Sequence, residues 1–279
     1  MTVLRTARGA AVGYDEFGDP LAPPLVLIQG LSAQRLGWRP EFCEALAGAG
    51  FRVLRFDNRD VGQSQRYPEG GYGLADLATD TADFLDELGL ESAHIVGQSM
   101  GGIVAQYFAE AFPARVRSLG LLYTSASLRH FIGADAILDR AAEAPPVTRD
   151  EFIVFYPASE AVCASTAYPQ DVGWLASVAG EIWDNGVDPA GVERQLQAVL
   201  AFTERLDEAR LITAPTAIIA GDSDRLIDSA ASVELHELIA GSTLRVFAGM
   251  GHELPEPLWG EIVEALASNA RQTPQPAVR

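Results

Sequence analysis

Five short runs of apolar residues, separated by segments of helical character, dominate the pattern of this 279-residue chain. The runs are rich in β-branched residues and nearly continuous in hydrophobicity, which is typical of strands buried on both faces of a sheet. They are PPLVLIQG (23–30), FRVLRFD (51–57), AHIVGQ (93–98), RVRSLGLLYT (115–124) and APTAIIAG (214–221), and a further strand, STLRVFAG (242–249), follows them. Repeats of strand, helix and strand form right-handed crossovers. The pattern therefore predicts an α/β fold with a mostly parallel sheet covered by helices on both sides.

The segments between the strands carry helix signals. The helix expected at 74–90 places its apolar residues three and four positions apart, on one face. They are Leu74, Leu77, Ala78, Thr81, Phe84, Leu85 and Leu88. Other helices are expected at 39–50, which ends in glycine, and at 100–112, 228–240 and 257–270. Before the first buried strand, TVLRT (2–6) and AAVGYDEFG (10–18) predict an antiparallel hairpin.

The regular alternation is interrupted between Ser125 and Arg210. This stretch has the pattern of helices separated by APPVT, AYPQD and NGVDPAG, whose prolines and glycines mark loops. The length of the chain and its 48% hydrophobic content favour one elaborated domain over two independent ones. We therefore expect a core of residues 1–124 and 211–270 with a helical cap inserted at 125–210. The tail at 271–279 has too little apolar content to pack and is expected to be disordered.

Charge and cysteine content exclude several classes of function. The 20 basic and 38 acidic residues give a net charge of −18, which repels nucleic-acid phosphates and anionic lipid surfaces, so neither is an expected partner. Cys43 and Cys163 lie far apart in the sequence and are expected to be buried free thiols rather than a disulfide or a metal site. Arg5 and Arg8 interrupt the N-terminal segment, and no apolar run approaches the roughly 18 residues of a membrane span. A soluble, cytoplasmic protein is expected.

A serine bracketed by glycines follows one of the strands. The motif VGQSMGG (96–102) places Ser99 at the junction of the strand 93–98 and the helix 100–112, which is the context of a nucleophile elbow. Side chains at Gly97 and Gly101 would collide with the neighbouring strand and helix. The turn strains the serine backbone, exposes its Oγ and directs the helix N-terminus toward an oxyanion formed there. The pattern predicts that Ser99 is a nucleophile; the alternative is an ordinary serine in a glycine-rich turn.

A serine hydroxyl needs a base within hydrogen-bond reach, and that base needs a third group that fixes its tautomer. His252 lies in GMGHELP, after the last strand and at the same carboxyl edge of the sheet, where loops carry the chemistry of open parallel sheets. His94 begins a strand and His236 lies within a helix, so both are expected to serve packing or to lie on the surface, while His130 lies in the cap. The sequence predicts His252 as the general base.

The third group is expected from IIAGDSD, which follows a buried strand. Asp224 stands three residues after Gly221, so the chain turns out of the sheet before it, whereas Asp222 remains near the strand end. Asp224 is favoured, and Asp222 is the alternative. Both acids could instead cap the following turn.

An acyl-transfer site also needs donors for the negative charge that develops on the carbonyl oxygen. The backbone N–H of Met100, directly after the nucleophile, is one expected donor. The second is expected from the loop QGLSAQRLGW (29–38), where Gly30 allows the turn and Leu31 N–H is best placed. A plain glycine turn is the alternative explanation of that loop.

These motifs together resemble the α/β-hydrolase superfamily over nearly the whole chain, from residue 2 to about 270. The resemblance rests on the order Ser99, Asp224, His252 and on GQSMGG, the QG loop, FDNRDVGQS and GMGHELP. Within the superfamily, FGDP, FDNRDVGQS, YGLADLATD and GMGHELP are similar to the aclacinomycin methylesterase group and to the cofactor-free haloperoxidase-like esterases. The resemblance implies the α/β-hydrolase fold, with an eight-stranded, mostly parallel sheet, helices on both faces and an inserted helical cap.

A serine nucleophile argues against the branches of the superfamily that open epoxides or remove halides with an aspartate. We expect a carboxylic ester hydrolase that acts through an acyl-serine; the alternatives are a carbon–carbon bond hydrolase or a lactonase with the same triad and, from another class, a non-catalytic ligand-binding homologue. No metal or organic cofactor is expected, because this hydrolysis needs neither redox chemistry nor a Lewis acid. The expected partner is a small ester, and a homodimer is left open.

The substrate is expected between the cap and the sheet edge, in an apolar cavity that favours a neutral, moderately hydrophobic ester, such as a methyl ester of a ring-bearing natural product. Candidate substrate-binding residues are Gln29, Gly30, Tyr123, Trp174, Trp183 and Leu226, and Gln29 stands where many relatives have histidine. The other cap aromatics, Phe152, Phe155, Tyr156, Tyr168 and Phe202, are expected to pack between helices, with a subset lining the cavity. A cationic contact from Arg35, Arg59 or Arg129 would favour acidic substrates instead.

Overall fold

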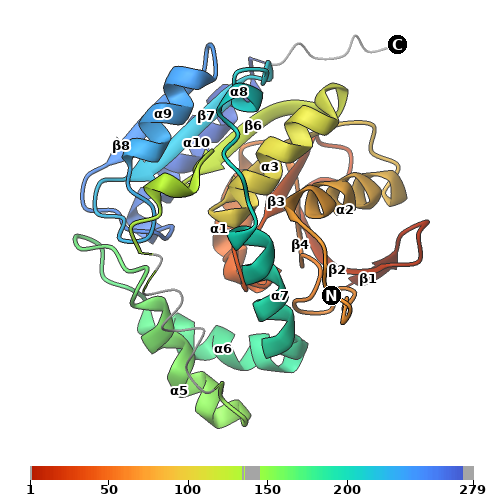
Figure 1. Cartoon of the computed structure of the whole chain (residues 1–279), viewed down its shortest axis with the longest axis vertical. Coiled ribbons are helices and arrows are strands. Elements are labelled where there is room, and N and C mark those ends of the chain that lie inside the picture. Colours follow the sequence, from red (N-terminus) through yellow and green to blue (C-terminus); the bar gives the residue numbers. More distant parts are fainter. Residues whose placement is uncertain (1, 134, 136–144, 273–279) are drawn as a thin grey trace.

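An eight-stranded sheet forms the centre of the computed structural model, which describes residues 2–133, 135 and 145–272 (Figure 1). The strands are β1 (Thr2–Arg5), β2 (Ala11–Phe17), β3 (Pro24–Ile28), β4 (Arg52–Phe56), β5 (Ala93–Gln98), β6 (Val116–Leu122), β7 (Thr216–Gly221) and β8 (Thr243–Phe247). Their order in the sheet is β1-β2-β4-β3-β5-β6-β7-β8. The expected hairpin of β1 and β2 is antiparallel, β2 also pairs with β4 antiparallel, and every pair from β4 to β8 is parallel.

Helices cover both faces of the sheet. On one face α1 (Pro40–Gly48) and α10 (Trp259–Ala270) pack against strand residues such as Leu25 and Leu27. On the other face α2 (Leu74–Glu87), α3 (Met100–Ala111) and α9 (Ala230–Leu238) pack against residues such as Val26 and Ile28. Successive residues of one strand thus enter two different cores, as the side-chain alternation of a strand requires. This explains why the central strands are apolar throughout.

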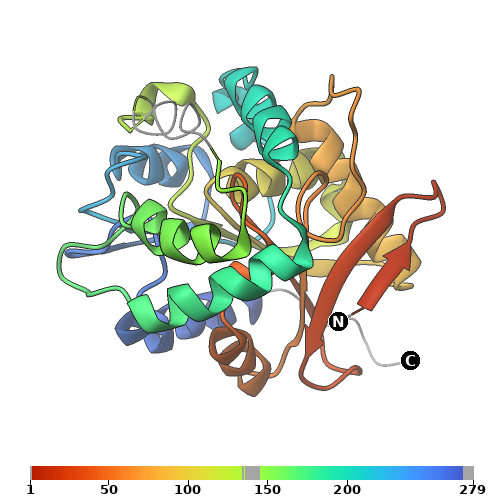
Figure 2. The same ribbon diagram turned by 90° about the horizontal axis from the view of Figure 1, so that it is seen from below.

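The stretch between β6 and β7 contains the helices α5 (Arg149–Glu160), α6 (Val172–Gly186), α7 (Pro189–Leu200) and α8 (Leu206–Ala209), and the 3₁₀ turn η3 (Leu128–His130). In Figures 1 and 2, α5 and α6 lie side by side across one end of the sheet, with α7 beside the segment that leads to α2. The division into core and cap remains a prediction from the sequence. The expected disordered tail lies, from residue 273 on, outside the described residues.

Parallel register brings the carboxyl ends of the central strands to one edge. Ile28 pairs with Gly97, Gln98 with Leu122, and Leu122 with Ile219. The loops that follow β3, β5, β6 and β7 therefore begin side by side, and they contain Gln29, Ser99, Tyr123 and Asp224. Among the described residues, none of the helices combines the length and apolar character that a membrane crossing requires.

Candidate active site

Ser99 occupies a strained turn between β5 and α3. Its backbone lies at φ 53° and ψ −124°, a region that residues with a side chain rarely adopt. The turn is fixed from both sides, because Ser99 N donates to Leu122 O (3.0 Å) and Thr124 Oγ1 donates to Ser99 O (2.7 Å). The helix α3 begins with Met100, directly after the serine.

The glycines around Ser99 are required by contact distances. A Cβ on Gly97 would overlap the carbonyl oxygen of Gly101, and a Cβ on Gly101 would overlap the carbonyl oxygen of Ile28. A Cβ on Gly30 would lie 3.3 Å from Ser99 Cβ, so the loop after β3 approaches the serine closely. These contacts agree with the steric reason expected for the motif.

His252 and Asp224 form a buried pair. His252 Nδ1 lies 2.7 Å from Asp224 Oδ2, and the side chains are 7% and 2% exposed. The other carboxylate oxygen of Asp224 accepts hydrogen bonds from Leu226 N (2.8 Å) and Ile227 N (3.0 Å). The carboxylate is therefore fixed by its own loop and can hold one tautomer of the imidazole, with the proton on Nδ1.

Asp222 does not reach this pair. Its side chain is exposed, and its Oδ1 accepts hydrogen bonds from Gly249 N (2.6 Å) and Ser223 Oγ (3.1 Å). Of the two acids that the sequence left open, the structure brings only Asp224 to His252.

The three remaining histidines are engaged elsewhere. His94 Nδ1 lies 2.8 Å from Ser118 Oγ, His130 Nε2 lies 3.1 Å from Glu234 Oε2, and His236 Nδ1 lies 2.9 Å from Ser242 Oγ. Burial, with a smaller effect of the Arg117 guanidinium, lowers the pKa of His94 to about 4. Among the described residues that line the cavity near Ser99, His252 is the one histidine.

The loop that carries His252 is held by the segment between α5 and α6, residues 163–170, which we call the connecting segment. The hydrogen bonds run from His252 N to Cys163 O (2.9 Å), from Gly251 N to Ser165 Oγ (2.9 Å), from Thr166 N and Ala167 N to Gly249 O (3.1 and 3.2 Å) and from Ser165 N to Glu253 Oε1 (2.7 Å). Side chains at Gly249 and Gly251 would clash with this segment. The position of His252 therefore depends on residues that lie between α5 and α6.

A cavity of about 430 Å³ contains Ser99 and His252 in its wall. Its size falls within the range of small-molecule sites, about 300–1,000 Å³. Aromatic side chains from α5 and α6 and from the core line it, namely Phe152, Phe155, Tyr156, Trp174, Trp38, Phe42 and Trp259. Cys43 is buried as expected, but Cys163 is only half-buried and lines this cavity, since the connecting segment that carries it borders the site.

Most of the residues named from the sequence meet at this cavity. It is lined by Gln29, Gly30, Leu31, Ser99, Tyr123, Trp174, Leu226 and His252. Trp183 is not among the described lining residues. It packs between α5 and α6, with its ring centroid 5.7 Å from that of Phe152, because its position on α6 faces the neighbouring helix. Tyr168 and Phe202 also pack in apolar clusters rather than in the wall.

The positive charge at the cavity is already neutralised. Arg39 lines the wall, but its guanidinium lies over the rings of Trp174 (4.8 Å) and Trp259 (5.0 Å). Asp171 and Glu256 approach the same group at 3.4 and 3.6 Å. The arginines suggested from the sequence, Arg35, Arg59 and Arg129, are not among the described lining residues and are paired with Asp57, Asp80 and Glu204.

Of the expected oxyanion donors, Met100 directly follows Ser99, and Leu31 lies in the loop that approaches Ser99 closely at Gly30. Gly30 N donates to Gln29 Oε1 (3.2 Å), whereas no hydrogen bond from the N–H groups of Leu31 and Met100 is found in the described part of the chain. The N–H of the first helical residue has no partner within its own helix. Leu31 and Met100 can therefore donate to a ligand, while Gly30 N–H is occupied.

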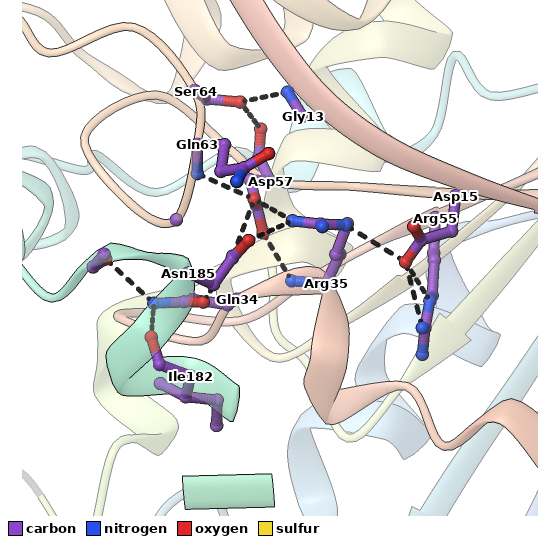
Figure 3. A network of polar contacts seen from close by, with 12 residues as sticks. Gly13, Asp15, Gln34, Arg35, Arg55, Asp57, Gln63, Ser64, Ile182 and Asn185 are labelled. Atoms are coloured by element: carbon purple, nitrogen blue, oxygen red, sulfur yellow. Dashed lines mark hydrogen bonds and ion pairs between the residues drawn. The ribbon is translucent and has the colours of Figure 1, made fainter. Parts of the chain in front are cut away.

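A buried polar network fixes the loop after β3 to the segment after β4 and to α6 (Figure 3). Arg35 donates through its backbone N to Asp57 Oδ1 (2.8 Å), and its guanidinium pairs with Asp57 and with Asp15. Asn185 of α6 completes the network by donating to Gln34 Oε1 (2.6 Å) and Asp57 Oδ2 (3.2 Å). Figure 3 shows these groups converging from β2, the loop after β3, the segment after β4 and α6.

Comparison with models of known protein families gives a match over most of the chain. The model of the alpha/beta hydrolase fold matches residues 23–256, which include the elbow, Asp224 and His252. The chain belongs to the alpha/beta hydrolase family. The fold and family expected from the sequence are thereby confirmed.

Several members of this family are similar in sequence. The rhodomycin D methylesterase of Streptomyces sp. (strain C5) is 39% identical over 147 residues, which are 52% of this chain and 48% of the methylesterase. The chain thus matches about half the length of that relative. A putative carbamate hydrolase of Variovorax paradoxus is 32% identical over 247 residues, 86% of this chain and 88% of its own. Among solved structures, a hydrolase from Pseudomonas aeruginosa PA01 has a TM-score of 0.77 and 26% identity, covering 96% of this chain and 97% of its own.

Three features of the site were not found from the sequence. Gln98 lines the cavity, and its position between Gly97 and Ser99 was the available signal. Arg39 and the connecting segment also border the cavity, but nothing in their sequence indicates that they meet Trp259 or the His252 loop. All three depend on contacts between distant parts of the chain.

Proposed function

We propose that the protein is a serine hydrolase that cleaves carboxylic esters through an acyl-serine intermediate. The observation that carries the proposal is the convergence of an elbow serine and a buried His252–Asp224 pair on one cavity. Ser99 supplies the nucleophile, His252 the base and Asp224 the group that orients it. The methylesterase relative supports an ester as the substrate.

In the proposed mechanism, Ser99 Oγ attacks the ester carbonyl as His252 Nε2 takes its proton. The N–H groups of Leu31 and Met100 donate to the oxyanion, and His252 returns the proton to the leaving alcohol. Water then attacks the acyl-serine with His252 again as the base, which releases the acid and the free serine. Asp224 stabilises the imidazolium in both halves of the reaction.

The proposed substrate is a neutral ester with a ring-bearing, moderately hydrophobic acyl or alcohol group. The aromatic wall offers ring faces for stacking, and Arg39 is already paired, so the cavity favours shape and apolar contact over charge. A methyl ester of a polycyclic natural product has this chemistry. A panel of methyl esters, lactones, carbamates and β-diketones, compared by kcat/KM and by product mass, distinguishes the ester from the alternative bonds.

The nucleophile is tested by Ser99→Ala. The variant loses one hydroxyl and is expected to keep the wild-type Tm while losing hydrolysis of a p-nitrophenyl ester and labelling by a fluorophosphonate. Intact-protein mass, before and after labelling, reports the covalent step directly. If Ser99→Ala retains turnover, or if the wild type carries the label elsewhere, the proposed mechanism is wrong.

A further inference from the structure

Three polar side chains from neighbouring strand ends form a chain of hydrogen bonds beneath the cavity. Tyr123, after β6, donates through its hydroxyl to Gln98 Oε1 at the end of β5. Gln98 Nε2 donates to Gln29 Oε1, after β3, and the same oxygen accepts from Gly30 N (3.2 Å). All four residues line the cavity that holds Ser99 and His252.

The direction of these hydrogen bonds is fixed by chemistry. Gly30 N–H can only donate, so Gln29 must present its oxygen toward it. Gln98 must then present its amide nitrogen to Gln29, which leaves its oxygen toward Tyr123. The tyrosine hydroxyl therefore acts as a donor, and each amide has one orientation.

The chain of hydrogen bonds touches three parts of the site. At one end Gly30 borders Ser99 in the loop that carries Leu31 N–H. In the middle Gln98 directly precedes Ser99. At the other end the Tyr123 ring packs edge-to-face on His252, with ring centroids 4.7 Å apart. Gln29 is fully buried, Tyr123 is 4% exposed and Gln98 is half-buried, so the two ends of the chain lie in surroundings of low polarity, which strengthens hydrogen bonds.

We propose that Gln29, Gln98 and Tyr123 are positioning residues that act as one unit, setting the oxyanion loop in register with Ser99 and His252. This rests on the proposed function. By occupying Gly30 N–H, Gln29 leaves Leu31 N–H as the donor of this loop. Oxyanion donors act over about 3 Å, and a displacement near 1 Å can cost about a hundredfold in rate, so the unit affects kcat more than substrate binding.

The test compares Gln29→Met, Gln98→Met, the double variant and Tyr123→Phe. Methionine keeps the length of glutamine without its hydrogen bonds, and phenylalanine keeps the ring on His252. Each methionine variant is expected to lower kcat about tenfold or more, with KM within about twofold of wild type. The double variant is expected to be no slower than the slower single one, because either change breaks the same unit. Tyr123→Phe is expected to lower kcat less.

A second measurement separates positioning from general stability. A trifluoromethyl ketone forms an oxyanion on the serine, so its affinity is expected to fall with kcat across the series, while product affinity stays constant. The control is Asn269→Leu, which removes a buried amide that donates to Leu119 O and Pro215 O, away from the cavity. It is expected to lower Tm with kcat unchanged.

The outcomes are distinct for the two proposals. If the glutamine variants lower Tm but keep the kcat and ketone affinity of wild type, or if their effects on kcat multiply in the double variant, the positioning unit is wrong. Should methionine prevent folding, Tyr123→Phe with unchanged kcat and ketone affinity overturns it as well. If the wild type neither hydrolyses esters nor takes a fluorophosphonate at Ser99, the proposed function itself is wrong.

Discussion

Single residues in strained conformations stand at the candidate active site. Ser99 and Tyr123 both have positive φ values, 53° and 36°, and both stand directly after strands that end at the cavity. The position of Ser99 was predictable, because the flanking glycines reveal a crowded backbone. The roles of Tyr123 and Gln98 were not predictable, since a polar or aromatic residue at the end of a strand has many allowed side-chain directions. Their hydrogen bonds became visible only with the neighbouring strands in place.

Conservative substitutions distinguish the roles of the two acids after β7, Asp222 and Asp224. Asp224→Asn keeps an oxygen for Leu226 N and Ile227 N but turns an amide nitrogen toward His252 Nδ1, which selects the wrong tautomer. We expect kcat to fall about 10³- to 10⁴-fold. Asp222→Asn, on an exposed side chain, is the matched control and is expected to change kcat less than about twofold. The reverse ranking in ester hydrolysis would assign the acid to Asp222.

His94 predicts a pH dependence of stability. Its pKa is about 4 in the folded protein against 6.5 ordinarily, because burial disfavours the charged ring. Below 6.5 the unfolded chain therefore binds a proton that the folded chain does not, and the stability present above 6.5 is lost progressively as the pH falls toward 4. Wild type is expected to lose roughly 2 kcal/mol more than His94→Asn between about pH 7.5 and pH 5, measured by urea unfolding. Equal losses in the two proteins would contradict this origin.

At the scale of elements, the central strands and their covering helices were predictable because buried strands and amphipathic helices have distinct periods. The structure places β5 and β7 within the expected runs, and all the core helices within the expected segments. The way in which the segment between β6 and β7 docks on the sheet was not predictable. Asn185, Gln195 and Arg194 look like surface residues in the sequence, yet Asn185 and Arg194 bond to the buried Asp57 and Asp60, and Gln195 accepts from the half-buried Ser32 N. Polar contacts of this kind have no periodic signature.

In the buried network of Figure 3, removing one charged partner is expected to cost more stability than removing both. Arg35 and Asp57 have side chains 1% and 0% exposed, so Arg35→Met leaves a buried carboxylate without its main partner. We expect a loss of about 3–5 kcal/mol in the free energy of unfolding, measured with urea. Arg35→Met combined with Asp57→Leu is expected to recover part of this loss, since the double variant buries no unpaired charge. A double variant less stable than the single one would contradict the account.

For the whole molecule, the excess of acidic groups extends to the cavity. Glu160, Asp188, Glu193 and Glu253 are among its lining residues, and Arg39, the one arginine in the described wall, is stacked and paired. The net charge of −18 acts only locally, because salt screens charges beyond about 8 Å at physiological ionic strength. The carboxylates at the wall are therefore the ones that a substrate meets.

Two esters that differ only by a distal carboxylate test this expectation. The neutral ester is expected to have the higher kcat/KM at low salt, and the difference is expected to shrink as salt is added. An ester that carries a distal alcohol in place of the carboxylate controls for polarity without charge. Faster turnover of the carboxylate-bearing ester at both salt concentrations would show a cationic contact and contradict the proposed substrate class.

The hydrogen bonds between the connecting segment and the His252 loop also limit how such a hydrolase can be rebuilt. Exchanging the segment between β6 and β7 for that of another family member changes the wall of the pocket, but it also replaces the Cys163 backbone and the Ser165 hydroxyl that hold the His252 loop. Under the proposed mechanism, substrate specificity and proton transfer therefore depend on the same segment of this chain. A chimera that alters only the choice of substrate must therefore keep residues 163–170 of this chain together with its His252 loop, and exchange only the residues on either side of that segment.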